Sequence, residues 1–268
     1  MIKPRLILLC DYGLDDAVAT VYLLNRKDMF DGIDILAVAG NTPASHCHNN
    51  AKILLSNFFE NQTIPNDIRL ITTSSLPQNA ALVESVHGKD GMGDMLTLKP
   101  FVVTELSFDS WIKEIITVNP PITLVSLGPC TVTKKILEHI IPATFLLMGG
   151  RALAKPNFNG YEFNHYLDKE AFEFCAGQPN ALVATLDTCR HPRFNQVGKH
   201  KKGDTLLVRL INRTIYIKTL RHPDNCYIYD YITVHYLTHP DCFKIIRRDA
   251  QGVTLNQLEL LEKAELEI

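Results

Sequence analysis

The chain has 268 residues, of which 46% are apolar and 21% are charged, and its formal net charge is -2. This composition excludes a disordered or low-complexity protein, and the balanced charge excludes a broad cationic surface for nucleic acid or an anionic membrane. The longest apolar stretches, such as 6–9 and 141–148, are much shorter than the roughly 20 residues of a membrane span, so we expect a soluble protein.

Short apolar runs alternate with segments of helical periodicity along the chain. The runs predicted as strands cover 6–9, 35–39, 68–71, 122–125, 144–148 and 181–186. Helices are predicted over 15–24, 49–58, 131–140, 169–175 and 205–220, and over 230–237, where Asp230 is expected to cap the helix. Continuous apolar runs are typical of parallel strands with helices on both faces. Because no linker or internal repeat divides it, the chain (1–268) is predicted to be one α/β domain with a mostly parallel central sheet.

The seven cysteines are scattered, odd in number and without a C-x-x-C pair, which argues against a disulfide framework or a zinc ribbon. Reduced cysteines in apolar runs act as small hydrophobic residues, and we interpret all seven in this way. The N-terminus lacks the apolar region and cleavage site of a signal peptide. We therefore expect a cytoplasmic location.

Acidic residues gather after the first predicted strand, where Asp11, Asp15 and Asp16 follow within six residues. In parallel sheets, ligands bind beyond the carboxyl ends of the strands. Asp15 and Asp16 also fit the capping of a helix N-terminus, but capping does not account for Asp11. Three neighbouring carboxylates repel one another unless a cation or a proton lies among them, and oxygen ligands without Cys or His favour Ca²⁺ or Mg²⁺ over zinc.

Other nucleotide and phosphate chemistries fit this turn poorly. It holds the single glycine Gly13, so neither a G-x-G-x-x-G dinucleotide motif nor a Walker loop is present. A phosphatase with an aspartyl nucleophile would need a second acid at the position of Gly13, so the turn disfavours that chemistry.

Seven segments in order resemble the inosine-uridine type nucleoside hydrolases. The stretch from Asp11 to Ala17 is similar to the family's D-x-D-P-G-x-D-D signature. The other six are Gly40-Asn41 with Asn50-Ala51, the loop His87 to Gly91 (H-G-x-x-G), Leu124 to Thr131 (L-x-x-x-G-P-L-T), Met148 to Gly150, Asn157 to Asn164 with Asp168, and Asp230 with Tyr236, Leu237 and Pro240. Each match alone is weak, but their common order over nearly the whole chain is specific.

The resemblance implies a calcium site, a catalytic base and a ribose site. The implied Ca²⁺ ligands are the carboxylates of Asp11, Asp16 and Asp230 and the backbone carbonyl of Leu127. Asp11 is also the implied base that activates a metal-bound water. The implied substrate-binding residues are Asp15, Asn41, His87, Asn157, Glu162, Asn164 and Tyr229. Carboxylates and amides suit a sugar because each hydroxyl both donates and accepts hydrogen bonds.

Several neighbouring residues have structural explanations that require no ligand. Of Asn157 and Asn159, one is expected to serve only the turn at Gly160. Asp168 is expected to cap the following helix. Asp187, which follows the predicted strand 181–186, is not expected to contact the substrate directly.

Four departures from the family pattern bear on activity. Leu9 replaces its first aspartate, Tyr12 its proline, Val132 an asparagine, and Tyr229 the histidine of one branch. With Tyr229 there, the departing base must rely on stacking, on a tyrosine hydroxyl, or on His235.

We therefore expect calcium-dependent hydrolysis of the N-glycosidic bond of a ribonucleoside, by a homo-oligomer (dimer or tetramer), without nucleic-acid or membrane partners. The alternatives are a metal- and ribose-binding homologue without turnover and a hydrolase of another ribosyl compound.

Overall fold

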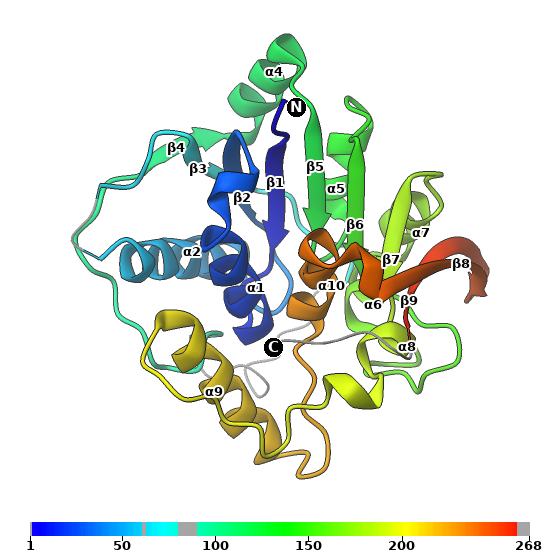
Figure 1. Cartoon of the computed structure of the whole chain (residues 1–268). Helices are drawn as coiled ribbons and strands as arrows, with labels where there is room; N and C mark the ends of the chain where they lie inside the picture. The colour runs from blue at the N-terminus through cyan, green and yellow to red at the C-terminus, as the bar shows by residue number, and fades with distance from the viewer. Residues whose placement is uncertain (1, 61–62, 80–89, 262–268) are drawn as a thin grey trace.

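A nine-stranded sheet runs through the computed structural model, which describes residues 2–60, 63–79 and 90–261 (Figure 1). Its order is β4-β3-β2-β1-β5-β6-β7-β9-β8, and all neighbours are parallel except β8 and β9. The strands are β1 (Arg5–Cys10), β2 (Gly32–Ala37), β3 (Ile68–Thr72), β4 (Thr104–Ser107), β5 (Ile122–Ser126), β6 (Thr144–Met148), β7 (Ala181–Ala184), β8 (Phe243–Ala250) and β9 (Val253–Leu260). The predicted α/β fold with a mostly parallel sheet is thus confirmed.

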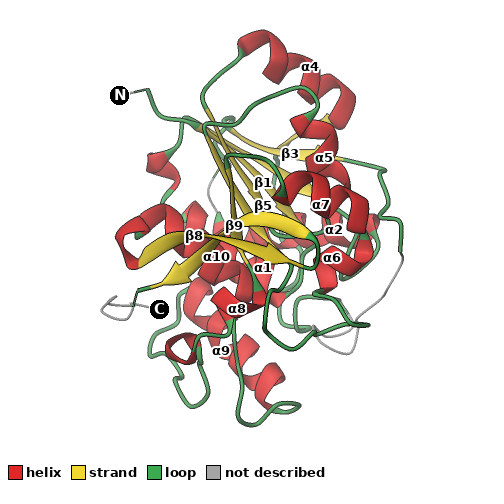
Figure 2. Cartoon of the chain, turned by 90° about the vertical axis from the view of Figure 1, so that its right-hand side faces the viewer, coloured by secondary structure: helices red, strands yellow, loops and turns green. Residues whose placement is uncertain are grey.

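Helices cover both faces of the sheet, as the view along its edge shows (Figure 2). One face packs against α1 (Leu14–Leu24), α2 (Ala44–Phe58), α8 (Leu186–Cys189), α9 (Leu206–Thr219) and α10 (Tyr229–Thr238). The other face packs against α4 (Phe108–Val118), α5 (Thr131–Leu137) and α7 (Lys169–Ala176), and the short α6 (Phe163–Leu167) precedes α7. None of the described helices has the length and apolar character needed to cross a membrane.

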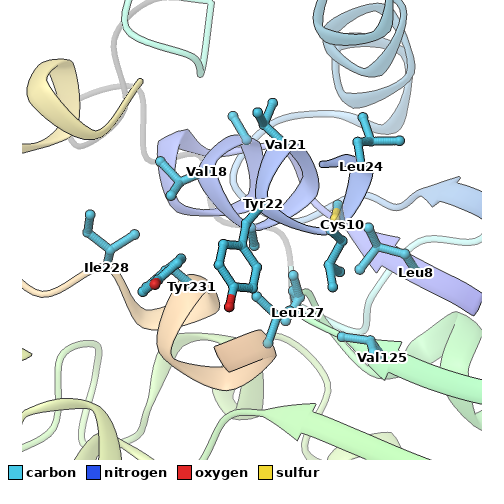
Figure 3. Close-up of a cluster of buried hydrophobic side chains, with 14 of the residues drawn as sticks. Leu8, Cys10, Val18, Val21, Tyr22, Leu24, Val125, Leu127, Ile228 and Tyr231 are labelled. Carbon is cyan, nitrogen blue, oxygen red and sulfur yellow. The ribbon is translucent and has the colours of Figure 1, made fainter. Parts of the chain in front are cut away.

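Alternation along β1 builds the two cores. Leu6 and Leu8 belong to the core under α1 and α10, whereas Ile7 and Leu9 belong to the core under α4, α5 and α7. This explains why β1 reads as a continuous apolar run. In the first core, Tyr22 of α1 meets Tyr231 of α10 edge to face, with ring centroids 4.9 Å apart (Figure 3).

All six predicted strands and all six predicted helices are present, with ends shifted by up to five residues. Asp230, however, was wrongly predicted to cap its helix, because the N-cap position of α10 is Ile228. The sequence interpretation missed β4 and α4, and it missed the β8–β9 hairpin. The signal for the hairpin was the pair Gln251-Gly252, both with positive φ (57° and 91°), as a two-residue hairpin turn requires.

The seven cysteines are free thiols, six of them buried, as expected for reduced structural residues.

A buried ion cluster joins β1, β2 and β3. The Asp34 carboxylate accepts two hydrogen bonds from Arg5 (2.6 and 2.7 Å), two from Arg69 (2.7 and 3.0 Å) and one from Trp111 Nε1 (2.8 Å). Although burial acts in the opposite direction, these donors and the positive charges hold the pKa of Asp34 below its usual value.

The order in which successive strands are added to the sheet changes direction between β1 and β5. Strands β2, β3 and β4 extend from one side of β1, and β5, β6 and β7 extend from the other. Such a switch point is where open parallel sheets bind ligands, beyond the strands' carboxyl ends.

Candidate active site

A cavity of about 650 Å³ opens beyond the carboxyl ends of the strands around this switch point, a size typical of small-molecule sites. The residues that line it come from the segments after β1, β2, β5 and β6, from the residue after α8, from the end of α9 and the segment that follows it, and from the start of α10. The sequence-predicted site residues on its wall are Asp11, Asp15, Asn41, Leu127, Asn157, Glu162, Asn164, Tyr229 and Asp230. His87 lies outside the described residues.

Asp11 is held by the loop that follows β2. The backbone N–H and the side-chain amide of Asn41 donate to its two carboxylate oxygens, each at 2.8 Å. A Cβ at Gly40 would lie 2.0 Å from Asp11 Oδ2, so only glycine permits this close approach. Asn41 thus orients the carboxylate that sequence reasoning selected as the base.

Asp16 lies behind Asp11 and is fully buried, so it does not reach the cavity wall. Its carboxylate accepts from the backbone N–H groups of Gly13 (2.8 Å) and Asp11 (3.2 Å). Burial raises the pKa of Asp16 to about 6, although these bonds oppose the rise. Burial, followed by the charge of Asp16, raises the pKa of Asp11 well above its usual value.

Asp230 points its carboxylate to the same cavity from the first turn of α10. Burial raises its pKa well above the usual value, and the charges of Asp16, Asp15 and Asp11 raise it further. The carboxylate forms no ion pair or hydrogen bond with the described residues. Asp11, Asp16 and Asp230 therefore meet here without an ion-pair partner among the described residues.

These oxygens have the chemistry of a site for a hard divalent cation, since buried, mutually repelling carboxylates favour a positive ion. The arrangement is not a closed ligand shell, because no three His, Cys, Asp or Glu side chains of the described chain surround one point as metal ligands. The Leu127 carbonyl, an expected ligand, accepts a hydrogen bond from Asn164 Nδ2 at 2.7 Å. The donor chemistry fits a cation, and calcium stays a prediction.

A lysine that sequence reasoning missed holds Asp15. Lys218, near the end of α9, donates from Nζ to Asp15 Oδ2 (2.6 Å) and to the Tyr227 carbonyl (2.7 Å). Asp15 Oδ2 also accepts the Tyr229 N–H at 3.0 Å, whereas the buried Oδ1 has no hydrogen-bond partner in the described chain. Burial lowers the pKa of Lys218, but the charges of Asp15 and Tyr229 and the hydrogen bond to Asp15 together outweigh it and raise the pKa overall. Lys218 differs from other lysines of the chain in being buried on α9, and a single sequence does not show burial. Sequence reasoning therefore had no signal by which to select it.

Glu162 caps α6 while lining the cavity. Its oxygens accept from the backbone N–H groups of Gly150, Asn164 and His165, each at 3.0 Å. Burial raises its pKa, although these three bonds act against the rise. Glu162 therefore has a structural function that the sequence did not reveal.

The asparagine-rich loop divides its tasks as expected. Asn157 lines the cavity, whereas Asn159 takes a positive φ of 40° next to Gly160 and serves the turn. Asp187 accepts from the backbone N–H groups of Ala152, Leu153 and Ala154 (2.7–2.9 Å), which fixes the segment before Asn157. Asp168 caps α7 as predicted, through the N–H of Ala171.

The departures from the family pattern have local explanations. Leu9 and Val132 are core residues. Tyr12 is fully buried with φ 45°, a conformation closed to proline, so the turn after Asp11 differs from one built around proline. His235 does not line the cavity; it is buried and stacks on His239 with ring centroids 4.2 Å apart.

Comparison with known proteins agrees with the fold described above. The family model described as inosine-uridine preferring nucleoside hydrolase matches residues 6–262. The pyrimidine-specific ribonucleoside hydrolase RihA of Escherichia coli O81 is 26% identical over 268 residues, covering 91% of this chain and 82% of that protein. RihA of Salmonella arizonae is 32% identical over 212 residues, covering 72% of this chain and 66% of that protein.

Solved structures share the fold. An inosine-guanosine nucleoside hydrolase superposes with a TM-score of 0.71 at 18% identity, covering 94% of this chain and 87% of that one. The type III effector XopQ, in complex with adenosine diphosphate ribose, has a TM-score of 0.63 at 12% identity, covering 97% of this chain and 88% of that one.

The family match over nearly the whole chain, together with the mostly parallel α/β sheet, therefore defines the class of protein as a ribonucleoside hydrolase. The chain belongs to the inosine-uridine preferring nucleoside hydrolase family. Membership supports hydrolysis of the N-glycosidic bond of a ribonucleoside as its activity.

Proposed function

We propose that this protein hydrolyses ribonucleosides to ribose and free base with the help of Ca²⁺, with Asp11 as the general base. The observation that carries the proposal is the cavity at the β1–β5 switch point, where Asp11, Asp15 and Asp230 share one wall with Asn41 and Asn164. Among nucleobases, pyrimidines are the proposed leaving groups, because the RihA relatives are named pyrimidine-specific.

Asp15 supplies an acceptor for a ribose hydroxyl. Its Oδ2 is already occupied by Lys218 and the Tyr229 N–H, which leaves the buried Oδ1 without a partner. A buried carboxylate oxygen without a hydrogen bond is costly, and a hydroxyl of bound sugar would relieve that cost. Asn157 and Asn164 add amide groups on the same wall.

Asp11 takes the proton from the attacking water, in an orientation fixed by its two hydrogen bonds from Asn41. Glycosidic cleavage passes through an oxocarbenium-like, positively charged sugar, and the negative charges of Asp11, Asp15 and Asp230 stabilise that charge. A calcium ion held by Asp11, Asp16, Asp230 and the Leu127 carbonyl would acidify water and bind hydroxyls. Of these groups, Asp16 accepts hydrogen bonds from the N–H groups of Gly13 and Asp11, and the Leu127 carbonyl accepts one from Asn164.

Tyr229 is the candidate donor for the departing base. Arg190 Nε donates to the Tyr229 hydroxyl oxygen (3.4 Å), so the hydroxyl proton is free to point toward the base. The Tyr229 ring lies on the cavity wall with Lys218 Nζ 4.8 Å from its centroid, and such a face suits stacking.

The decisive experiment incubates the protein, in calcium, with purine, pyrimidine and nicotinamide ribosides and measures the release of reducing sugar. Wild type should turn over at least one riboside, and Asp11→Asn should lose about 10²- to 10⁴-fold while keeping the fold by circular dichroism. Asp204→Asn, on an exposed loop, is the control. Near wild-type turnover by Asp11→Asn would refute the base assignment. If none of the ribosides is hydrolysed but riboside binding is retained, the result would favour a metal- and ribose-binding homologue without turnover.

The cation is tested without turnover. Calorimetric titration of chelator-treated protein with Ca²⁺ should show one site, and Asp230→Asn should weaken it by more than tenfold. Equal affinity in wild type and variant would exclude Asp230 as a ligand. The expected homo-oligomer and cytoplasmic location also remain predictions; light scattering tests the first.

A further inference from the structure

Arg190 lies on the cavity wall beside the tyrosine assigned to the departing base. It follows α8 directly and is half-buried, and its Nε donates to the Tyr229 hydroxyl oxygen at 3.4 Å. Both residues line the cavity together with Tyr227, whose ring centroid lies 6.4 Å from that of Tyr229. The guanidinium therefore belongs to the part of the cavity where the base is expected to lie.

The positive charge of Arg190 has no carboxylate partner among the described residues. Lys218, another cation on the same wall, is by contrast paired with Asp15 at 2.6 Å. Water screens a half-buried charge less than an exposed one. The charge of Arg190 therefore acts on whatever occupies the cavity beside it.

The guanidinium of Arg190 is anchored by the loop that follows β6. Its Nη1 donates to the Lys155 carbonyl at 2.6 Å. The segment before this carbonyl is itself held by Asp187, whose carboxylate accepts from the backbone N–H groups of 152–154 at 2.7–2.9 Å. A planar guanidinium that is anchored at one nitrogen presents its other donors in a fixed direction. The anchor therefore directs Nε toward the Tyr229 hydroxyl.

The Tyr229 hydroxyl is left with one proton to donate. Its oxygen accepts the hydrogen bond from Arg190, and no described residue accepts a bond from this hydroxyl. Hydrogen bonds in a chain polarise one another, so a hydroxyl that accepts from a cation becomes a stronger donor. The base of a bound substrate is the acceptor that this arrangement favours.

We propose that Arg190 is a positioning residue for the leaving group, which directs and polarises the Tyr229 hydroxyl toward the base and stabilises the negative charge that the base acquires. The inference rests on the proposed hydrolytic function. Water gives one proton to Asp11 and its oxygen to C1′, and the electron pair of the C1′–N bond departs with the base. The base then takes up a proton from water, which replaces the proton that Asp11 returns to the solvent. Nothing is oxidised or reduced.

The test compares kcat for uridine with kcat for p-nitrophenyl riboside, whose leaving group is already stable as an anion. Arg190→Gln should lower kcat for uridine by about 10- to 100-fold, as expected when a positioned donor is lost, and should affect p-nitrophenyl riboside much less. Arg190→Lys, which keeps the charge, should recover part of the loss. An equal loss on both substrates, or no loss on uridine, would overturn the inference.

Three control variants separate this role from support of the loop. Asp187→Asn loosens the same loop without changing the contact to Tyr229, so it should lower both rates alike; a loss confined to uridine would assign the effect to the loop instead. In a Tyr229→Phe background, Arg190→Gln should have a much smaller effect on uridine than in wild type, because the two residues act as a unit. An undiminished effect there would overturn the coupling. Arg209→Gln, which is exposed on α9 and does not line the cavity, should leave both rates unchanged.

Binding of free bases tests Arg190 without turnover. If wild type does not hydrolyse uridine, the proposed function fails for that substrate, and calorimetry decides the role of Arg190 alone. 5-Nitrouracil, unlike uracil, is an anion at neutral pH, so wild type should bind it at least about tenfold more tightly, the worth of one charge-assisted hydrogen bond. Arg190→Gln should lose this preference and Arg209→Gln should keep it. Equal binding of the two bases by wild type, or a preference that persists in Arg190→Gln, would overturn the inference.

Discussion

Lys218 Nζ lies 2.6 Å from Asp15 Oδ2, so the last turn of α9 is joined to the first turn of α1 by a buried ion pair. The side chains are only 11% and 5% exposed. The lysine fixes one oxygen of Asp15 and leaves the other for a ligand. The same ion pair therefore contributes both to ligand binding and to the stability of the fold.

Lys218→Met should cost about 3–5 kcal/mol of unfolding free energy, because it leaves the Asp15 carboxylate buried without its cation. Urea denaturation measures the loss, and Lys218→Met/Asp15→Asn should recover part of it. Lys134→Met, which breaks the exposed pair with Glu170, is the matched control and should change stability little. A loss in the double variant equal to the sum of the losses in Lys218→Met and in Asp15→Asn would show that the two residues are not coupled.

Tyr229→Phe should slow hydrolysis of a natural nucleoside by about 10- to 100-fold, at or just below the usual range for a positioned proton donor. p-Nitrophenyl riboside, whose leaving group needs no proton, should be affected much less. His235→Ala should leave the ratio of the two rates as in wild type, since His235 does not line the cavity. Selective loss of nucleoside hydrolysis in His235→Ala would make His235 the acid instead.

His235 should make the protein sensitive to acid. Burial lowers its pKa to about 4, and the charges of His239 and Arg26 contribute. Between its ordinary value of 6.5 and about 4, the unfolded chain takes up a proton that the folded chain does not, so stability falls as pH falls through this window. His235→Phe should flatten the dependence of unfolding free energy on pH there.

His165 is an independent check on that reasoning. Burial lowers its pKa to about 4 as well, and it stacks on Phe172 with ring centroids 4.2 Å apart. His165→Phe should flatten the same window by a similar amount, and the double variant by about the sum. An unchanged slope in both single variants would show that neither histidine takes up its proton on unfolding.

Asp34→Asn should destabilise the fold by about 3–5 kcal/mol at neutral pH, because Arg5 and Arg69 lose their buried partner. The folded pKa of Asp34 is depressed, so its contribution is present above the ordinary value near 3.9 and is lost as pH falls toward the folded pKa. The difference from wild type in urea denaturation should therefore shrink in acid. Asp204→Asn, on an exposed side chain, should show neither effect.

Local signals determined much of this protein. Continuous apolar runs predicted the parallel strands, and Asp11 and Asn41 followed from polar residues at strand ends, because parallel strands bring their carboxyl ends to one edge. Asn164 was implied only by the resemblance to the family. The hairpin β8–β9 and the strand β4 escaped detection because their faces are half-exposed and mix charged with apolar residues.

Only the tertiary structure determined which side chains form hydrogen bonds and ion pairs with one another. Lys218 and Asp15 are 203 residues apart, and Arg190 meets Lys155 and Tyr229 across different loops. In the sequence, these basic residues cannot be distinguished from lysines and arginines that lie on the solvent-exposed surface. Whether a charge is paired, buried or left facing a cavity depends on which distant segments the fold brings beside it, and no local pattern encodes that.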